Sequence, residues 1–341
     1  MAKMYYEQDA DQQALTGKTI AVFGYGSQGH AQANNFRDSG LKVIIGLRPG
    51  GASAKKATED GFEVLDFPEA AAKADLIHIL LPDELHVDVF NRIKQSITPG
   101  KILSCSHGLN FHFGLITPPE GVDVIMMAPK APGPTVRREY INGFGVPALV
   151  AAHTDSSGKA LSYALALAKA NGSTKVGCFE TTFKDETETD LFGEQTVLCG
   201  GAAYMIKAGF ETLVEAGYPE EMAYFECVHE LKLIVDLIYR GGIYGMSKKI
   251  SNTAKWGQFT IGPTVITAES KKGMKEALRK IQDKEFVKGW IEEEYRQKNL
   301  STLNHFMEDC HEWPVEKVGR QIRKVAGLEE VETGEEDKNK K

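Results

Sequence analysis

Paired cysteines, long apolar runs and basic stripes are the features that this sequence has least of. Its five cysteines are scattered along the chain and form no C-x-x-C pair, which argues against a disulfide framework and against a zinc site. No stretch reaches the roughly 18 apolar residues of a membrane span, and the first residues, MAKMYYEQDAD, show no apolar leader. We therefore expect a cytoplasmic protein with no membrane association.

The charge pattern offers little to a nucleic acid. The formal net charge is −7, and the basic pairs at Arg137-Arg138 and Lys271-Lys272 are short and isolated. A nucleic-acid surface needs basic residues gathered on one face. We expect a small-molecule substrate and no nucleic-acid partner.

Two domains are expected from the length of 341 residues and from a change of pattern along the chain. Apolar, β-branched runs alternate with helical stretches over residues 18–180, which predicts an α/β fold: a Rossmann-type, doubly wound parallel sheet with helices on both faces. Long amphipathic stretches follow. We predict a nucleotide-binding domain over 1–182, an all-α domain over 183–327 and a disordered acidic tail over 328–341.

The stretch GYGSQG has the G-x-G-x-x-G spacing and lies between a predicted strand and a predicted helix. Such glycines allow a tight turn, close approach of a pyrophosphate and helix-on-strand packing, and the helix N-terminus favours phosphate. An ordinary connection between a strand and a helix is the alternative. The predicted cofactor contacts here are Gly24, Tyr25, Gly26, Ser27, Gln28 and Gly29.

The end of the second predicted strand favours NADP over NAD. NAD enzymes usually place an acid there for the ribose 2′-hydroxyl, but IIGLRPGGAS offers Arg48 and Ser53, with no acid before Glu59. Arg48 can bind a 2′-phosphate through its planar guanidinium. Use of NADH stays open, as does the alternative that Arg48 is a solvated loop residue.

Four carboxylates form two pairs at helical spacing. Asp190 and Glu194 are four residues apart, as are Glu226 and Glu230, so each pair lies on one helix face, where like charges repel. Hard oxygen ligands without matching His or Cys suit Mg²⁺ or Mn²⁺. We predict two Mg²⁺ ions; the alternative is a pair of solvated acidic helix faces.

The order of several long motifs resembles one known family. FGYGSQGHAQANN, LPDE, SHGLN, APKAPGPTVR, TETDLFGEQTVLCGG, FECVHELKLIVDLIY and ISNTAKWG, spread over roughly residues 4–325, resemble ketol-acid reductoisomerase, also called acetohydroxyacid isomeroreductase, in its shorter form with a single helical domain. The resemblance implies that the helical domain is knotted, an exception to the usual rule. It also implies at least a homodimer.

The resemblance further implies a reaction and its residues. The family converts 2-acetolactate to 2,3-dihydroxyisovalerate, and 2-aceto-2-hydroxybutyrate to its homologue 2,3-dihydroxy-3-methylvalerate, in valine and isoleucine biosynthesis. The matched positions are Asp190, Glu194, Glu226 and Glu230 for Mg²⁺, His107, Lys130 and Glu230 for catalysis, Ser251 and Cys199 for substrate, and Pro82, Asp83 and Gly133 for the cofactor.

The chemistry of that reaction accounts for a metal and a nicotinamide in one site. Alkyl migration needs a deprotonated hydroxyl beside a polarised ketone, which two Mg²⁺ ions can provide, with Glu230 as a candidate proton acceptor. Hydride from the nicotinamide then reduces the rearranged keto acid. Whether His107 transfers a proton or positions other groups stays open.

The sequence departs from the family pattern on the cofactor side. Gly51 stands where Ser is common, so discrimination against NADH is expected to be weaker. Ala131 and Pro134 stand where Gly and His are usual, and His86 where Gln is common. Two rival readings remain: a metal-free β-hydroxyacid dehydrogenase that uses a lysine, and a non-catalytic NADP-binding protein.

Overall fold

The computed structural model of the protein describes residues 3–326, so the tail expected at 328–341 lies outside the described residues. The chain divides into two compact units, Met1–Asp190 and Leu191–Lys341, each described here by itself. The division lies within helix α8 (Phe183–Gly193), after the boundary expected between residues 182 and 183, so the first turns of α8 belong to the first unit.

A nine-stranded sheet forms the centre of the first unit, in the order β1-β9-β8-β7-β6-β5-β2-β3-β4. Most neighbours run parallel, whereas β7 and β8 pair antiparallel, as do β1 and β9. The predicted fold class is confirmed. In chain order the strands are β1 (Met4–Tyr5), β2 (Thr19–Phe23), β3 (Lys42–Gly46), β4 (Glu63–Leu65), β5 (Leu76–Ile79), β6 (Ile102–Cys105), β7 (Asp123–Pro129), β8 (Ala148–Thr154) and β9 (Cys178–Glu180).

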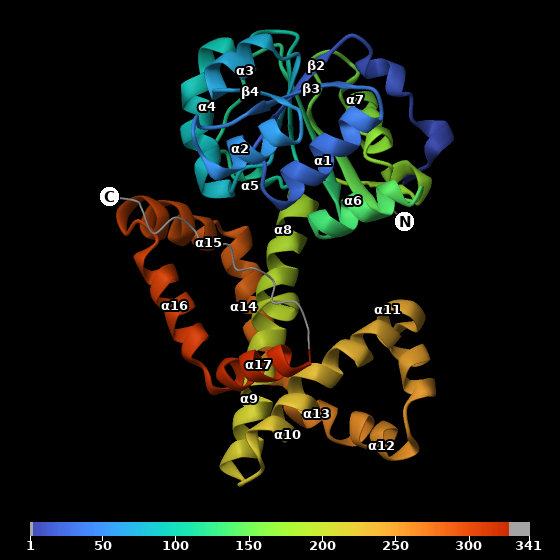
Figure 1. Ribbon diagram of the computed structural model, residues 1–341, viewed down its shortest axis with the longest axis vertical. Coiled ribbons are helices and arrows are strands. Elements are labelled where there is room, and N and C mark those ends of the chain that lie inside the picture. The colour runs from blue at the N-terminus through green and yellow to red at the C-terminus, as the bar shows by residue number, and fades with distance from the viewer. Residues whose placement is uncertain (1–2, 327–341) are drawn as a thin grey trace. The chain divides into compact units, whose positions relative to one another are not determined.

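Helices cover both faces of this sheet and bury two apolar cores (Figure 1). One core joins strand residues to α1, α2 and α7, including Phe36 and Leu167. The other joins the opposite side chains of the strands to α3, α4 and α5, including Phe67 and Phe90. The helices are α1 (Ser27–Asp38), α2 (Ala52–Glu59), α3 (Phe67–Lys73), α4 (His86–Ile93), α5 (Leu109–His112), α6 (Gly133–Ile141) and α7 (Ala160–Ala170). Strands buried on both faces explain the continuous apolar runs in the sequence.

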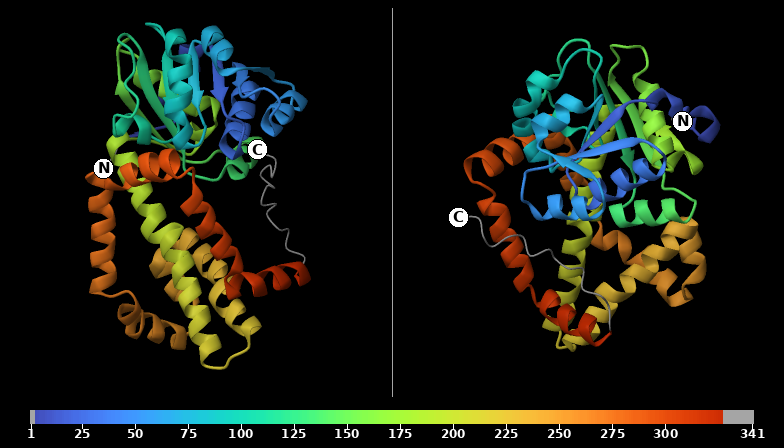
Figure 2. Two further views of the ribbon diagram at one scale, coloured as in Figure 1. Left: turned by 90° about the vertical axis from the view of Figure 1, so that its left-hand side faces the viewer. Right: turned by 45° about the horizontal axis from the view of Figure 1, so that its top comes forward.

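The described part of the second unit is entirely helical, as both views in Figure 2 show. Helix α11 bends at Gly242, whose φ of 66° lies outside the helical region. The segments are η6 (Glu194–Leu198), α9 (Gly200–Glu215), α10 (Glu220–Tyr224), η7 (Phe225–His229), α11 (Glu230–Lys249), α12 (Asn252–Thr260), α13 (Gly262–Val265), α14 (Ala268–Gln282), α15 (Glu285–Val287), η8 (Lys288–Gln297), α16 (Ser301–Glu312) and α17 (Pro314–Val325). The knot stays a prediction.

Three segments in the described part of the second unit are π-helical: η6 and η7, which lie at the acidic pairs, and η8, which does not. Glu194 opens the π-helical segment η6, and Glu226 lies inside the π-helical segment η7, directly before Glu230. In η6 the amide of Cys199 bonds to the carbonyl of Glu194, five residues earlier. Single π-helical turns are rare and are frequent at functional sites. Both predicted ligand pairs therefore have an unusual local backbone.

One helical stretch among the described residues, Phe183–Glu215, is long and apolar enough to cross a membrane by length and composition alone. Its first turns carry acidic side chains that include Glu186, Glu188 and Asp190. A helix of this kind is also found in proteins that never meet a membrane, so it is weak support for a span.

Candidate functional site at the carboxyl edge of the sheet

Three predicted site residues follow three neighbouring parallel strands. Asp83 comes after β5, His107 after β6 and Lys130 after β7, while the glycine-rich turn follows β2. The carboxyl ends of these strands meet at one edge because β2, β5, β6 and β7 run in the same direction. Ligands of open α/β sheets bind at this edge.

The glycine-rich turn has the geometry that the spacing predicts. Gly24 has a φ of +101°, and a β-carbon there would lie 2.6 Å from the carbonyl oxygen of Leu80. A β-carbon at Gly29 would lie 2.2 Å from the carbonyl oxygen of Gly24, so only glycine allows this close packing. A β-carbon at Gly26 would meet no atom within 4 Å, and no side chain caps the N-terminus of α1. The turn is therefore open where a pyrophosphate would approach.

The residues predicted to select the cofactor lie between β3 and α2. Arg48 is in the connecting loop, and Ser53 is in the first turn of α2, which has Gly51 as its N-cap and no side-chain cap. Within residues 3–326 the side chains of Arg48 and Ser53 make no hydrogen bond or ion pair with other protein groups. Both side chains are thus available to an anion.

The loop after β7 packs directly on the glycine-rich turn. A β-carbon at Gly133 would lie 2.1 Å from the carbonyl oxygen of Ser27, and the side-chain amide of Gln28 donates to the carbonyl of Ala131 at 2.8 Å. Pro82 precedes Asp83 at the end of β5. Gly133 therefore holds two loops together, whether or not it also touches the cofactor.

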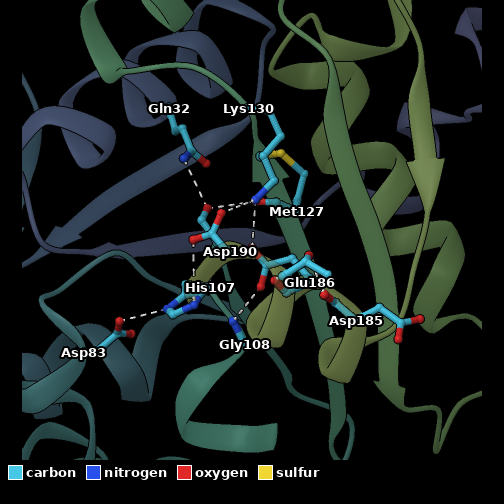
Figure 3. Close-up of polar contacts among 11 residues, drawn as sticks. Gln32, Asp83, His107, Gly108, Met127, Lys130, Asp185, Glu186 and Asp190 are labelled. Atoms are coloured by element: carbon cyan, nitrogen blue, oxygen red, sulfur yellow. Dashed lines mark hydrogen bonds and ion pairs between the residues drawn. The ribbon is translucent and has the colours of Figure 1, made fainter. Parts of the chain in front are cut away.

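A charged cluster joins His107, Lys130 and the first turns of α8 (Figure 3). Lys130 Nζ lies 3.0 Å from Glu186 Oε1 and 2.9 Å from Asp190 Oδ1. His107 Nδ1 lies 2.8 Å from Asp83 Oδ2, and His107 Nε2 lies 3.9 Å from Asp190 Oδ2. The other Glu186 oxygen accepts from the backbone amide of Gly108 at 3.2 Å.

The charges in this cluster support one another. Burial lowers the pKa of His107, but the hydrogen bond from its ring to Asp83 and the nearby carboxylates outweigh that effect and raise the pKa to about 9. Burial likewise lowers the pKa of Lys130, and Glu186 and Asp190 more than reverse it. Burial raises the pKa of Asp83, but His107 makes the net shift downward. The cluster holds two cations against three carboxylates.

One buried nitrogen of the cluster, His107 Nε2, can serve a ligand. Among the described residues His107 Nε2 is buried and has no hydrogen-bond partner, because Asp190 is too distant for a hydrogen bond. Buried polar atoms are rarely left without a partner in folded proteins. The imidazole is therefore suited to donate to a bound substrate or water.

The sequence analysis did not single out Glu186. Its side chain is almost fully buried, and it holds Lys130 and the backbone of Gly108. Glu186 precedes Asp190 by four residues, as Asp190 precedes Glu194, so the same helical spacing that identified the pair extends one turn further back. That spacing could have predicted it.

The four predicted metal ligands are divided between the two units. Within residues 3–326 no group of three or more His, Cys, Asp or Glu side chains is arranged to hold a metal ion. Asp190 ends the first unit, whereas Glu194, Glu226 and Glu230 belong to the second. Glu226 and Glu230 are exposed, and no ion pair is recorded for either within the described part of the chain. Their oxygen donors still fit Mg²⁺ by chemistry.

The two predicted substrate residues are accessible in the second unit. Ser251 caps the N-terminus of α12, where its Oγ accepts from the amide of Ala254, so its hydroxyl hydrogen can still be donated. Cys199 is an exposed free thiol between η6 and α9. Their contact with a substrate stays a prediction.

The open glycine-rich turn and the charged cluster at one sheet edge define a nicotinamide-dependent oxidoreductase. Residues 14–177 match the family model of the acetohydroxy acid isomeroreductase NADPH-binding domain, and residues 183–327 match that of the ketol-acid reductoisomerase C-terminal domain. The chain belongs to the ketol-acid reductoisomerase family, in the short form with a single C-terminal domain. Its activity lies in branched-chain amino acid biosynthesis.

Similarity to individual proteins supports this family assignment. The chain is 56% identical over 330 residues to ketol-acid reductoisomerase (NADP(+)) of Methanocaldococcus jannaschii, covering 96% of this chain and 99% of the relative. It is 51% identical to the structure of an NADH-preferring ketol-acid reductoisomerase from an uncultured archean, with a TM-score of 0.91 over 95% of this chain and 99% of that one. A semialdehyde dehydrogenase NAD-binding protein from Cupriavidus necator, 16% identical with a TM-score of 0.60 over 79% of this chain and 99% of that one, shares only the fold.

Proposed function

We propose that this reductoisomerase converts 2-acetolactate, and its homologue 2-aceto-2-hydroxybutyrate, to the 2,3-dihydroxy acids in a Mg²⁺-dependent reaction with NADPH as the preferred hydride donor and NADH as a second one. The observation that carries this proposal is the cluster of Asp83, His107, Lys130 and Asp190 beside the open glycine-rich turn. The carboxyl edge of an open α/β sheet is where such cofactors bind, so a buried imidazole and a candidate metal ligand at this edge support the proposal.

Asp190, Glu194, Glu226 and Glu230 are the residues that would hold two Mg²⁺ ions. When bound, the metal would supply Lewis-acid polarisation of the substrate ketone and a lowered pKa of the neighbouring hydroxyl. Lys130 orients Asp190 through its 2.9 Å ion pair and lowers the repulsion between that carboxylate and Glu186. The rival metal-free dehydrogenase gives these four carboxylates no role.

The chain's own side chains account for proton movement and orientation. His107, fixed by Asp83, presents Nε2 as a hydrogen-bond donor to the substrate, 3.9 Å from Asp190 Oδ2. Glu230 is exposed and is proposed as the acceptor of the substrate hydroxyl proton, while the Ser251 hydroxyl and Cys199 contact the substrate. Arg48 and Ser53 bind the 2′-phosphate.

A second copy of the chain completes the metal site in this proposal. The helices that follow the second acidic pair carry large apolar side chains in solvent: Tyr239 is 90% exposed, Tyr244 73% and Trp256 74%. Exposed apolar surface of this kind marks a protein interface. In this proposal the carboxylates of two chains meet in a homodimer to form the metal site.

The assembly has its own test. Tyr239→Asp, which places a charge in the apolar surface, is expected to give monomers by light scattering and to abolish turnover. Lys275→Ala, on the exposed side of α14, is the matched control and is expected to keep the dimer. An active, monomeric wild-type protein would contradict the shared site.

We also place the enzyme in the cytoplasm, in keeping with its free cysteines.

The metal assignment is tested by Glu230→Gln. Oxidation of NADPH with 2-acetolactate should require Mg²⁺ in the wild type and be lost in Glu230→Gln, whereas NADPH binding should persist. Glu220→Gln, in the first turn of α10, is the control. Unimpaired turnover by Glu230→Gln, or turnover that survives EDTA, would overturn the metal assignment.

A further inference from the structure

A continuous set of buried hydrogen bonds links the centre of the sheet to the predicted site. His78 in β5 is fully buried; its Nδ1 lies 2.8 Å from Ser104 Oγ in β6, and its Nε2 lies 2.8 Å from Gln32 Oε1 in α1. The Gln32 amide nitrogen then lies 3.0 Å from Gln28 Oε1 and 3.2 Å from Ser106 Oγ. Figure 3 shows the Gln32 amide directed toward the charged cluster.

Two backbone carbonyls at the ends of this network fix which group donates in each hydrogen bond. The carbonyl of Ala131 can only accept, so the Gln28 amide donates to it, and Gln28 Oε1 is left to accept from Gln32. The carbonyl of Met127 likewise takes the Ser106 hydroxyl hydrogen, so Ser106 Oγ also accepts from Gln32. The Gln32 amide nitrogen is thus the donor in both bonds.

The same logic fixes the state of His78. Because the Gln32 amide nitrogen donates to Gln28 and Ser106, its Oε1 faces the imidazole. His78 Nε2 must therefore carry the hydrogen, and Nδ1 accepts from the Ser104 hydroxyl. The ring is neutral, in agreement with burial that lowers the pKa of His78 to about 3. Every donor and acceptor of His78 and Gln32 along this path has a partner.

The two branches end on the two halves of the site. Gln28 lies on the glycine-rich turn and bonds to the loop that carries Lys130. Ser106 directly precedes His107, whose ring Asp83 holds. A rotation of the Gln32 amide would therefore disturb the cofactor side and the His107 side together.

We propose that His78 and Gln32 are positioning residues, which hold Gln28 of the cofactor turn and Ser106 beside His107 in one fixed arrangement. The inference rests on the proposed function, because it assumes that the turn binds NADPH and that His107 meets the substrate. Neither His78 nor Gln32 needs to touch a ligand. Their effect is transmitted through two hydrogen bonds of one primary amide.

The test separates positioning from ordinary stability. His78→Met removes both ring hydrogen bonds, and we expect the dissociation constant and the KM of NADPH to rise about fivefold, the value of roughly one net hydrogen bond. His78→Gln keeps one acceptor and one donor, and we expect it to restore NADPH binding to within about twofold. Ile77→Val, on the same buried strand, is the control for destabilisation alone and should leave NADPH binding unchanged.

Binding of NADPH is measured by fluorescence titration of the folded protein without substrate, beside kcat and the melting temperature. Equal NADPH affinities in the wild type, His78→Met and Ile77→Val, with only the melting temperatures lowered, would overturn the proposal. If His78→Met does not fold, Ser104→Ala is used instead. This variant removes the hydroxyl that donates to His78 Nδ1 and should weaken NADPH binding about twofold. Failure of the wild type itself to bind NADPH would instead overturn the proposed function.

Discussion

His107 Nδ1 donates to Asp83 Oδ2 at 2.8 Å, and this bond sets which nitrogen of the ring faces Asp190. Asp83 was predicted as a cofactor contact, yet in the described structure its carboxylate is engaged by His107 and lies close to His86 as well. A carboxylate in this position fixes the ring orientation and favours the charged imidazolium. Its removal should therefore act on the reaction more than on cofactor binding.

Asp83→Asn is expected to lower kcat by roughly 10- to 100-fold, because the loss of an orienting partner lets the imidazole rotate and deprotonate. The dissociation constant of NADPH should change less than about twofold. Steady-state kinetics and fluorescence titration measure the two quantities, with Glu84→Gln as the neighbouring control. A weaker NADPH complex at unchanged kcat would show that Asp83 is a cofactor contact instead.

Arg48→Ala tests the choice between the two nicotinamides. A guanidinium bound to a 2′-phosphate contributes a charge-assisted hydrogen bond, so we expect NADPH affinity to fall about 10-fold or more while NADH affinity stays the same. The effect should shrink at high salt. Lys42→Ala, at the opposite end of β3, is the control. An unchanged ratio of the two affinities would make Arg48 a solvated loop residue.

The sequence predicted the sheet well where burial is strong and poorly where strands are short. The apolar, β-branched runs predicted over residues 18–180 correspond to β2, β3 and β5 to β9, whereas β1 (Met4–Tyr5) and β4 (Glu63–Leu65) were missed, because two or three residues show no periodicity. Asp83, His107 and Lys130 could be placed at one edge because the carboxyl ends of parallel strands meet there. Their bonds to each other depend on side-chain directions that spacing does not record.

The local backbone structure of the helical unit was harder to predict from the sequence. The long amphipathic stretches predicted an all-α domain but gave no sign of the π-helical segments at Glu194–Leu198, Phe225–His229 and Lys288–Gln297. An extra residue in one turn leaves the apolar pattern nearly intact, so periodicity cannot detect it. Spacing likewise shows that two carboxylates share a helix face but not which other groups would complete the proposed metal site.

Glycines after the first π-helical segment explain how the chain tolerates it. A β-carbon at Gly200 would lie 2.1 Å from the carbonyl oxygen of Gln195, and one at Gly201 would lie 2.2 Å from that of Thr196. Gly200→Ala is therefore expected to destabilise the protein by about 1–3 kcal/mol and to weaken Mg²⁺ binding, since the turn beside Glu194 must change. Calorimetric titration with Mg²⁺ and thermal unfolding measure both effects.

The control for that prediction is a glycine in an ordinary helix. Gly273 in α14 has open space where a β-carbon would be, so Gly273→Ala should stabilise the protein by up to about 1 kcal/mol through helix propensity. Gly200→Ala with the stability and Mg²⁺ affinity of the wild type would show that the π-helical turn is dispensable.

The last prediction concerns acid stability and the buried ring of His78. Burial alone lowers its pKa to about 3, from an ordinary value of 6.5. Between these two values the unfolded chain binds a proton that the folded protein does not, so stability is full above pH 6.5 and falls as the pH is lowered. From pH 7 to pH 5 this one residue should cost about 2 kcal/mol of unfolding free energy.

His78→Gln cannot take up that proton, so its unfolding free energy should fall less between pH 7 and pH 5 than that of the wild type, by about the same 2 kcal/mol. Urea unfolding at both pH values measures the difference, and His305→Gln, an exposed histidine, is the control. Parallel losses in the wild type and His78→Gln would mean that the ring is already charged in the folded protein. Such a ring could not accept from Ser104, so His78 Nδ1 would have to donate to the Ser104 hydroxyl, while Nε2 would still donate to Gln32 Oε1.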